Sequence, residues 1–304
     1  MKKQTIILDS SQIDTFLTCP SQWDFGYRQN LTLTDADEKE AIAAGTFGHK
    51  WLEIYYTNRM LNKKASESAS LANSFDPDKA DEPDNHQYPL SKEMRHQVLQ
   101  RMQEYWMTYL ADDYLPDYKH KYEIHIVNDL PVDCYTKIPL IEQGFSHKLF
   151  DSPEYLFILE GRIDMLTSRA NNQLFMDHKF QLRERKLYPK SIQFKNYGLV
   201  TGCNFGIINY IRLHKEVKTS TLVREPISFS AMELRRWRAE LIGIYVDMAK
   251  EINNSLGFTH RWNACSGKFG YPCQFTHICE EPNPHTANLI KVQKYKEKKE
   301  WKPW

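Results

Sequence analysis

The sequence lacks any apolar run that approaches the ~18 residues of a membrane-spanning helix. Its first ten residues include two lysines but only a short apolar stretch, so they lack the apolar segment of a secretory signal. Charge of one sign is lacking too: 40 lysines and arginines oppose 39 acids, and the net charge of +1 excludes a histone-like cover of positive charge. The sequence contains no G-x-x-x-x-G-K-[ST] motif, so we expect this chain to have no helicase motor of its own. We expect an intracellular, cytoplasmic protein with no membrane partner, in the host cell's cytoplasm if the source is a virus.

Six cysteines in an intracellular protein are expected to stay reduced, and clustered cysteines then bind metal more often than they form disulfides. Three of them share one loop-rich stretch with C-x7-C-x5-C spacing: Cys265, Cys273 and Cys279. Cys19, at the end of a predicted helix, is the best candidate for a fourth ligand. Zinc and an iron–sulfur cluster both accept four thiolates, and the spacing does not choose between them. Cys134 and Cys203 stand alone near apolar sequence and are predicted to be small core residues.

Hydrophobic periodicity predicts both helices and strands. Expected helices span 11–19, 41–60, 91–111, 189–202 and 231–252, the last of them opened by an S-x-x-E capping box at Ser230 and Glu233. Expected strands span 122–127, 155–167, 174–180, 206–213 and 222–229. Residues 61–90 carry almost nothing to bury and are expected to form a mobile surface segment. This order predicts a mixed α/β core with a helical N-terminal lobe.

Two carboxylates interrupt apolar strands, where an unpaired charge is costly to bury. Asp164 and Asp177 each stand within such a run. Asp177 and Lys179 lie two residues apart on one predicted strand and face the same side. Gln193 and Tyr197 lie four residues apart on the following helix and share a face. Carboxylates on neighbouring strands can hold a hard divalent cation, and the lysine can orient or activate a water beside it.

These residues belong to a longer, ordered set of motifs. Ser10 to Pro20 includes Cys19, and Ala44-Gly-Thr-Phe-Gly-His49-Lys-Trp-Leu-Glu53 places a histidine on a helix. Then follow Gly161-Arg-Ile-Asp164, Asp177-His178-Lys179, Gln193-Phe-Lys-Asn-Tyr197 and the three C-terminal cysteines. The sequence resembles the PD-(D/E)XK nuclease superfamily, and within it the RecB-like exonucleases that carry an iron–sulfur cluster, such as the AddB nuclease domain and the CRISPR adaptation nucleases.

The resemblance implies a fold and a set of ligands. A single nuclease domain (1–304) would contain a restriction-endonuclease-like mixed sheet flanked by helices. Its parts would be a helical lobe (1–118), a nuclease core (119–230), a helix and cluster segment (231–280) and a basic tail (281–304), whose end from Lys291 to Trp304 we expect to be disordered. Mg²⁺ or Mn²⁺ would bind His49, Asp164, Asp177 and the backbone carbonyl of His178. Cys19 and the three C-terminal cysteines would hold a [4Fe–4S] cluster rather than zinc, and so clasp the lobe to the C-terminal segment.

The implied activity is that of a DNA exonuclease acting on single strands or free ends. It would serve recombination, repair, phage or CRISPR-type DNA processing, with helicase or recombination proteins as partners. Lys179 would stabilise developing charge or position a water, while Gln193 and Tyr197 hold the strand. A run of basic residues predicts a phosphate-tracking groove: Arg183, Arg185, Lys186, Lys190 and Lys195. Two alternatives stay open: a non-catalytic DNA-binding subunit that keeps the nuclease fold, and a structural zinc protein.

Overall fold

A six-stranded mixed sheet forms the centre of the structure, a computed structural model that describes residues 3–34, 40–75, 90–110, 114–127, 130–182, 190–213, 221–266 and 272–298. Its strands are β1 (Gln4–Leu8), β5 (Ile141–Asp151), β6 (Tyr155–Arg169), β7 (Asn172–Gln181), β8 (Phe205–Arg212) and β9 (Leu222–Ser228). They follow the order β1-β6-β7-β8-β9, and β5 also pairs with β6. The β1–β6 and β7–β8 pairs are parallel and the others antiparallel. The predicted mixed α/β core is confirmed.

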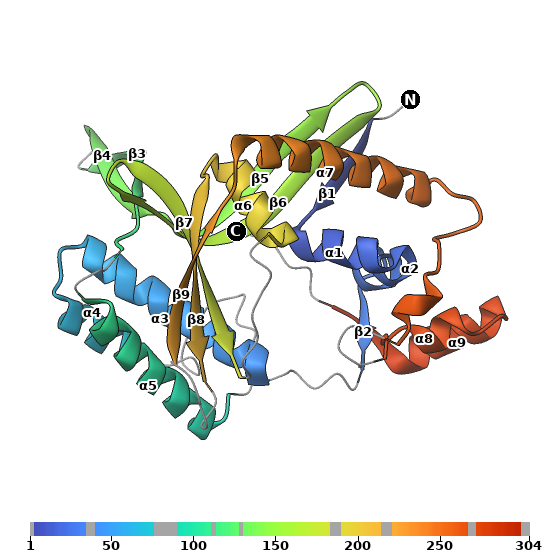
Figure 1. Cartoon of the computed structure of the whole chain (residues 1–304), viewed down its shortest axis with the longest axis horizontal. Coiled ribbons are helices and arrows are strands. Elements are labelled where there is room, and N and C mark those ends of the chain that lie inside the picture. The colour runs from blue at the N-terminus through green and yellow to red at the C-terminus, as the bar shows by residue number, and fades with distance from the viewer. Residues whose placement is uncertain are drawn as a thin grey trace.

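Helices cover the sheet on both faces (Figure 1). One face carries α3 (Glu40–Met60), α4 (Ala65–Asn73) and α5 (Lys92–Thr108), which bury Trp51 and Met102 against Met176 of β7. The other carries α1 (Ser10–Thr18), α6 (Ile192–Thr201) and α7 (Ala231–Ile252). There Phe175, next to Met176 on β7, packs on Phe194 of α6, because successive strand side chains point to opposite faces. The predicted capping box at Ser230 opens α7.

Shorter elements complete the chain. After α1 come α2 (Pro20–Trp23) and a π-helical turn, η1 (Asp24–Arg28). Two small antiparallel sheets pair β2 (Leu31–Leu33) with β10 (Tyr295–Glu297), and β3 (Tyr118–Val127) with β4 (Leu130–Pro139). The C-terminal part also contains η4 (Trp262–Ala264), α8 (Thr276–Cys279) and α9 (Pro284–Lys294). None of the helices in the described part of the chain combines the length and apolar character that a membrane span needs.

Two segments are more ordered than their composition predicted. The expectation of a mobile segment over 61–90 is wrong for α4, whose Ala69 and Ala72 are buried against α3 and α5; residues 76–89 lie outside the described ranges. The expectation of a disordered end over 291–304 is wrong for the last turn of α9 and for β10, and residues 299–304 lie outside the described ranges. Tyr295 packs on Phe275 there, with ring centroids 5.6 Å apart. A few small or isolated apolar side chains are enough to order both segments, because each segment packs on a core that other elements already form.

The centre of the chain holds strands that periodicity did not predict. β4 and β5 fill residues 130–151, and β5 alternates between half-buried and exposed side chains without a clear apolar face. Helix α6 begins at Ile192, with Ser191 as its N-cap, rather than at Pro189. The missed strand matters most, because β5 pairs with β6 along the segment that carries Asp164.

Strands β6 and β7 separate at the two predicted carboxylates, Asp164 and Asp177. Their ladder runs from Arg169↔Asn172 to Met165↔Met176 and stops there, whereas β7 continues along β8 through Asp177↔Ile208. The side-chain alternation of β6 also inverts at this point. Ile163 packs with α6, yet Met165, two residues later, packs with α3 and α5. Asp164 therefore occupies an irregular position from which both sides of the sheet are within reach.

Candidate active site

Side chains that form hydrogen bonds with the backbone of β6 and β7 stabilise the separation of these two strands. The His178 N–H donates to Oδ2 of Asp164 at 2.6 Å, and the Tyr197 hydroxyl donates to the carbonyl of Arg162 at 2.8 Å. Backbone groups away from water must be paired, and here a carboxylate and a phenol take the place of a neighbouring strand. Asp164 thus has a structural partner before any ligand binds.

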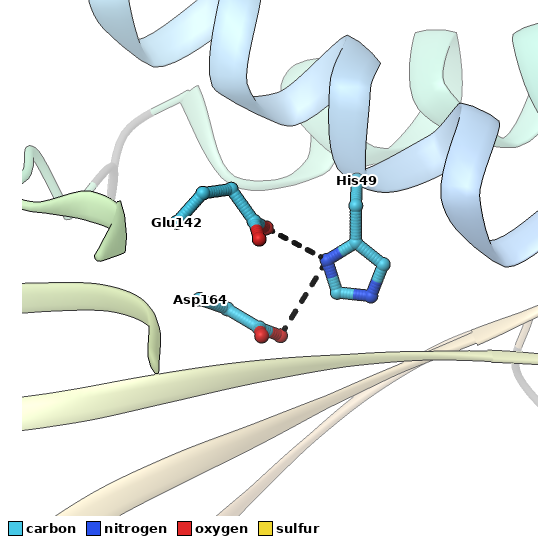
Figure 2. Close-up of side chains that lie close together, drawn as sticks. All are labelled: His49, Glu142 and Asp164. Atoms are coloured by element: carbon cyan, nitrogen blue, oxygen red, sulfur yellow. Dashed lines mark hydrogen bonds and ion pairs between the residues drawn. The ribbon is translucent and has the colours of Figure 1, made fainter. Parts of the chain in front are cut away.

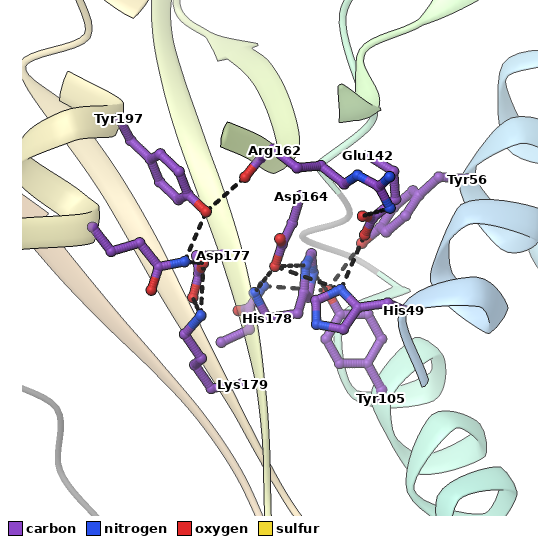
Figure 3. Close-up of polar contacts among 12 residues, drawn as sticks. His49, Tyr56, Tyr105, Glu142, Arg162, Asp164, Asp177, His178, Lys179 and Tyr197 are labelled. Carbon is purple, nitrogen blue, oxygen red and sulfur yellow. Dashed lines mark hydrogen bonds and ion pairs between the residues drawn. The ribbon is translucent and has the colours of Figure 1, made fainter. Parts of the chain in front are cut away.

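Asp177 lies on the α6 side of the gap, fully buried. Its Oδ1 accepts from Nζ of Lys179 at 3.0 Å and from Nε2 of Gln193 at 3.2 Å, and the same Nε2 lies 2.7 Å from the Tyr197 hydroxyl (Figure 3). Its Oδ2 lies 2.8 Å from the Lys179 ammonium but accepts no well-aligned hydrogen bond. The predicted i,i+2 and i,i+4 pairs therefore converge on one carboxylate. One oxygen of that carboxylate keeps ligand capacity.

Burial and charge set the protonation of this side of the site. Burial and the Asp164 carboxylate together raise the pKa of Asp177 to about 6, against the attraction of the Lys179 ammonium. Burial alone would lower the pKa of Lys179, but the Asp177 and Asp164 carboxylates outweigh it and the pKa lies above its usual value. Lys179 therefore stays a cation, which suits a group that stabilises anionic oxygen and does not suit a proton acceptor.

His49, Glu142 and Asp164 form a second group on the α3 side (Figure 2). His49 Nδ1 lies 3.0 Å from Oε1 of Glu142 and 3.6 Å from Oδ2 of Asp164. One ligand atom from each of the three residues lies within 4.8 Å of the others, and carboxylate and imidazole donors of this kind suit a divalent cation.

In the α3-side group, the proton on His49 supplies positive charge that a bound metal would otherwise supply. Burial would lower the pKa of His49, but the carboxylates of Asp164 and Glu142 raise it to about 9, so the imidazolium lies between two anions. Burial would raise the pKa of Asp164, but the His49 charge and the His178 side chain keep that pKa well below its usual range. The site therefore attracts a cation, and a metal that binds His49 must displace its proton.

Glu142 is the residue of this group that the sequence did not reveal. It lies at the start of β5, opposite Asp164, with φ at +48°, a left-handed conformation that non-glycine residues rarely adopt. Strained residues of this kind cluster at functional sites, and the Glu142 carboxylate lies 3.0 Å from His49 Nδ1. A carboxylate in a stretch without apolar alternation gave no signal, and only the β5–β6 register places it.

The predicted nucleic-acid contacts have mixed positions. Arg183, Arg185 and Lys186 lie outside the described residues. Lys190 pairs with Glu233 at the start of α7, and the Lys195 ammonium lies 3.7 Å from the centroid of the Trp237 ring. Both described lysines thus contact α7, and the basic groove stays a prediction.

The four predicted cluster ligands do converge. Cys19, Cys265, Cys273 and Cys279 line one pocket, together with Gln22, Arg261 and others, and none of the four is in a disulfide. Burial raises the pKa of Cys279 to about 12, and the neighbouring thiols add to it. Four thiols that crowd together as neutral groups fit a cation that would ionise them.

Backbone contacts fasten this pocket to the N-terminal lobe. Ser21 donates through its N–H to the carbonyl of Thr259 at 3.2 Å and through its hydroxyl to that of Phe258 at 3.0 Å. Cys203 lies in the α6 core, as predicted, whereas the Cys134 side chain is outside the described part. Residues far apart in sequence therefore contact each other beside this pocket, and the metal clasp stays a prediction.

Among the comparisons with known proteins, the match to a family model covers most of the chain. The model of the PD-(D/E)XK nuclease superfamily matches residues 10–280. A search of curated proteins finds no match. Among solved structures, one titled "Crystal structure of SSO0001" is similar at 18% identity and a TM-score of 0.30, over 46% of this chain and 59% of that chain, less than two thirds of its length. The chain belongs to the PD-(D/E)XK nuclease superfamily, whose members are generally phosphodiesterases that act on DNA with Mg²⁺ or Mn²⁺.

Proposed function

We propose that this protein is a metal-dependent exonuclease that acts on single-stranded DNA or on DNA ends, in recombination, repair, phage or CRISPR-type DNA processing with helicase or recombination partners. The observation that carries the proposal is the gap between β6 and β7. It brings Asp164, Asp177 and Lys179 together with Gln193 and Tyr197 from α6. A catalytic assembly of this kind needs carboxylates and a cation on neighbouring strand edges, and a purely structural sheet does not.

The proposed ligands of a single divalent cation are His49, Asp164, Asp177 and the backbone carbonyl of His178. The proximity of His49 and Asp164 to each other and to Glu142, an additional carboxylate, supports this assignment. When bound, Mg²⁺ or Mn²⁺ supplies Lewis-acid activation of the phosphodiester and of a water. The Oδ2 atom of Asp177, buried without a well-aligned hydrogen bond, supports this fit. The loss of the His49 proton on binding then returns the site to near-neutral charge.

The chain's own residues contribute to hydrolysis as follows. The Lys179 ammonium stabilises the negative charge that grows on the phosphate oxygens while a water oxygen bonds to phosphorus. The attacking water gives up one proton to solvent, the bond from phosphorus to the 3′ oxygen breaks, and that oxygen takes up one proton from solvent, which leaves a 5′-phosphate and a 3′-hydroxyl. Gln193 holds Asp177 and Tyr197 in register, so both carboxylates keep their orientation during the reaction.

The same proposal includes a [4Fe–4S] cluster on Cys19, Cys265, Cys273 and Cys279. The shared pocket and the absence of disulfides among these four support it. Iron, sulfide and zinc analysis of the purified protein separates the cluster from a zinc site. Cys273→Ala should abolish visible absorbance and lower the melting temperature, whereas Cys203→Ala, in the α6 core, should keep the absorbance. Absorbance and iron retained in Cys273→Ala would contradict the ligand assignment.

Cleavage of end-labelled single-stranded DNA with Mn²⁺ tests the activity. Linear substrate should be degraded and circular substrate spared, and EDTA should stop the reaction. Asp177→Ala should lose cleavage but keep DNA binding and the fold, while Asp247→Ala, an exposed aspartate paired with Lys250 on α7, should match the wild type. Wild-type protein that binds DNA without cleaving it would favour the non-catalytic alternative. Equal cleavage by Asp177→Ala would remove Asp177 from the mechanism.

A further inference from the structure

A buried tyrosine hydroxyl lies behind the site, on the α3–α5 side. Tyr105 of α5 is 1% exposed, and its Oη lies 3.3 Å from Nε2 of His178 and 3.0 Å from the hydroxyl of Tyr56 on α3 (Figure 3). His178 is the middle residue of the D-x-K motif, so its ring points to the face opposite Asp177 and Lys179. None of the motifs assigns a role to this imidazole or to Tyr105.

Two further groups approach the same hydroxyl from the sheet. Nδ2 of Asn209 on β8 and Nη2 of Arg224 on β9 each lie 3.4 Å from Tyr105 Oη. Nε of Arg224 also donates to Oδ1 of Asn209 at 3.0 Å, and its guanidinium stacks 3.6 Å from the Tyr109 ring centroid. The hydroxyl is therefore approached by side chains from four secondary-structure elements, α3, β7, β8 and β9, and lies in a polar network within an otherwise apolar core.

Donor chemistry gives this network a direction. A guanidinium and an amide nitrogen can only donate, so the Tyr105 oxygen accepts from Arg224 and Asn209. Its own proton has two acceptors within reach, Nε2 of His178 and the Tyr56 hydroxyl, and we assign it to Nε2, for which Tyr105 is the hydrogen-bond partner. With Nε2 accepting, the ring proton of His178 sits on Nδ1, which lies 3.8 Å from Oδ2 of Asp164, an electrostatic contact longer than a hydrogen bond. The same Oδ2 atom accepts the His178 backbone N–H at 2.6 Å.

We propose that Tyr105 and the His178 imidazole act together as a positioning device for Asp164, fixing the carboxylate orientation that binds the divalent cation. Tyr105 holds the ring so that Nδ1–H faces Asp164. The backbone hydrogen bond of His178 and the electrostatic attraction of its ring N–H then act on the same carboxylate oxygen. Groups behind metal ligands act in this way, and their removal typically weakens metal affinity about 10- to 100-fold. This inference rests on the proposed metal-dependent nuclease function.

Mn²⁺ binding tests the device without reference to turnover. Free Mn²⁺ is followed by electron paramagnetic resonance in titrations of wild type, Tyr105→Phe and Tyr109→Phe. Tyr105→Phe should bind Mn²⁺ about 10- to 100-fold more weakly and need correspondingly more Mn²⁺ for half-maximal cleavage, with kcat restored at saturating Mn²⁺. Tyr109→Phe keeps the ring that stacks on Arg224 and should bind like the wild type. Wild-type affinity in Tyr105→Phe, or equal weakening in both variants, would overturn the inference.

If Tyr105→Phe does not fold, a pair of substitutions at His178 tests whether the His178 imidazole positions Asp164. The amide of asparagine lies close to the Nδ1 position of histidine, so His178→Asn should retain most of the Mn²⁺ affinity. His178→Leu keeps the backbone N–H but has no donor, so it should lose affinity to the extent expected of Tyr105→Phe. Wild-type affinity in His178→Leu would refute the device. Wild-type protein that neither binds Mn²⁺ nor cleaves DNA would instead refute the proposed function.

Discussion

Replacement of Asp177 by asparagine should stabilise the metal-free protein while abolishing cleavage. The carboxylate is fully buried, and its only cationic hydrogen-bond donor among the described residues is Lys179. Asparagine has nearly the same size and can still accept from Lys179 and Gln193 through its carbonyl oxygen. The substitution therefore removes a buried charge and creates no cavity.

The magnitude follows from the pKa of this carboxyl. A pKa raised from 3.8 to about 6, chiefly by burial, corresponds to roughly 3 kcal/mol by which the folded state prefers the neutral group. The attraction of Lys179 already contributes to that value. Asparagine imitates the neutral carboxyl, so Asp177→Asn should raise the free energy of unfolding by up to ~3 kcal/mol at pH 8 in EDTA.

The pH dependence has a definite sign. A carboxyl whose pKa is higher in the folded state binds more protons there than in the unfolded chain between the two pKa values. The stability that Asp177 contributes as a neutral group is complete below pH 3.8, and it is lost as the pH rises through about 6. The difference between variant and wild type should therefore grow from pH 4.5 upward and level off above pH ~7.

Urea unfolding in EDTA across this pH range measures the difference directly. Asp247→Asn, on the exposed face of α7, controls for the loss of one negative charge. Added Mg²⁺ should stabilise the wild type and leave Asp177→Asn unchanged, since only the wild type keeps both strand carboxylates. A variant less stable than the wild type at pH 8, or a difference that does not vary with pH, would refute the reasoning.

Three further predictions concern α3, α7 and the site edge. A Cβ at Gly48 would lie 2.1 Å from the Phe180 ring, so Gly48→Ala should lower the free energy of unfolding in urea by about 1–3 kcal/mol and displace the adjacent His49. Gly45 has open space around it, so Gly45→Ala should not destabilise the protein. Ser230→Ala removes the N-cap of α7 and should cost ~1 kcal/mol by the same measurement. The Arg162 guanidinium lies at the site edge, so Arg162→Gln should weaken DNA binding and reduce the salt slope by about 1 in fluorescence anisotropy, and an unchanged slope would place it away from phosphate.

The parts of the site that the sequence predicted are those joined by short-range geometry. Asp177 and Lys179 share a strand face at i,i+2, and Gln193 and Tyr197 share a helix face at i,i+4, so each pair needs only its own element to form. The capping box at Ser230 is local in the same sense. The convergence of Cys19 with the C-terminal cysteines is long-range, and there the ordered motifs of a family supplied what spacing could not.

The parts that the sequence did not predict depend on long-range pairing. Glu142 reaches His49 only because β5 pairs with β6, and nothing in its own stretch marks it as buried. Helix α4 was misjudged for a related reason: Ala69 and Ala72 carry little apolar surface, yet they fill space that α3 and α5 leave. Composition gives the apolar surface that a segment itself can bury. Whether its side chains are buried also depends on the space that neighbouring elements leave open.

The inversion of β6 at Asp164 explains why one carboxylate can serve both sides of the site. In a regular strand Ile163 and Met165 would face the same layer, and Asp164 would face the other one only. Here Ile163 packs with α6 and Met165 packs with α3, so the backbone turns between them, beside the strained Glu142. Asp164 can then contact His49 and His178 on one side while its strand is held by Tyr197 on the other. A continuous β6–β7 ladder would close this gap, so substitutions that restore regular pairing should stabilise the sheet at the expense of metal binding.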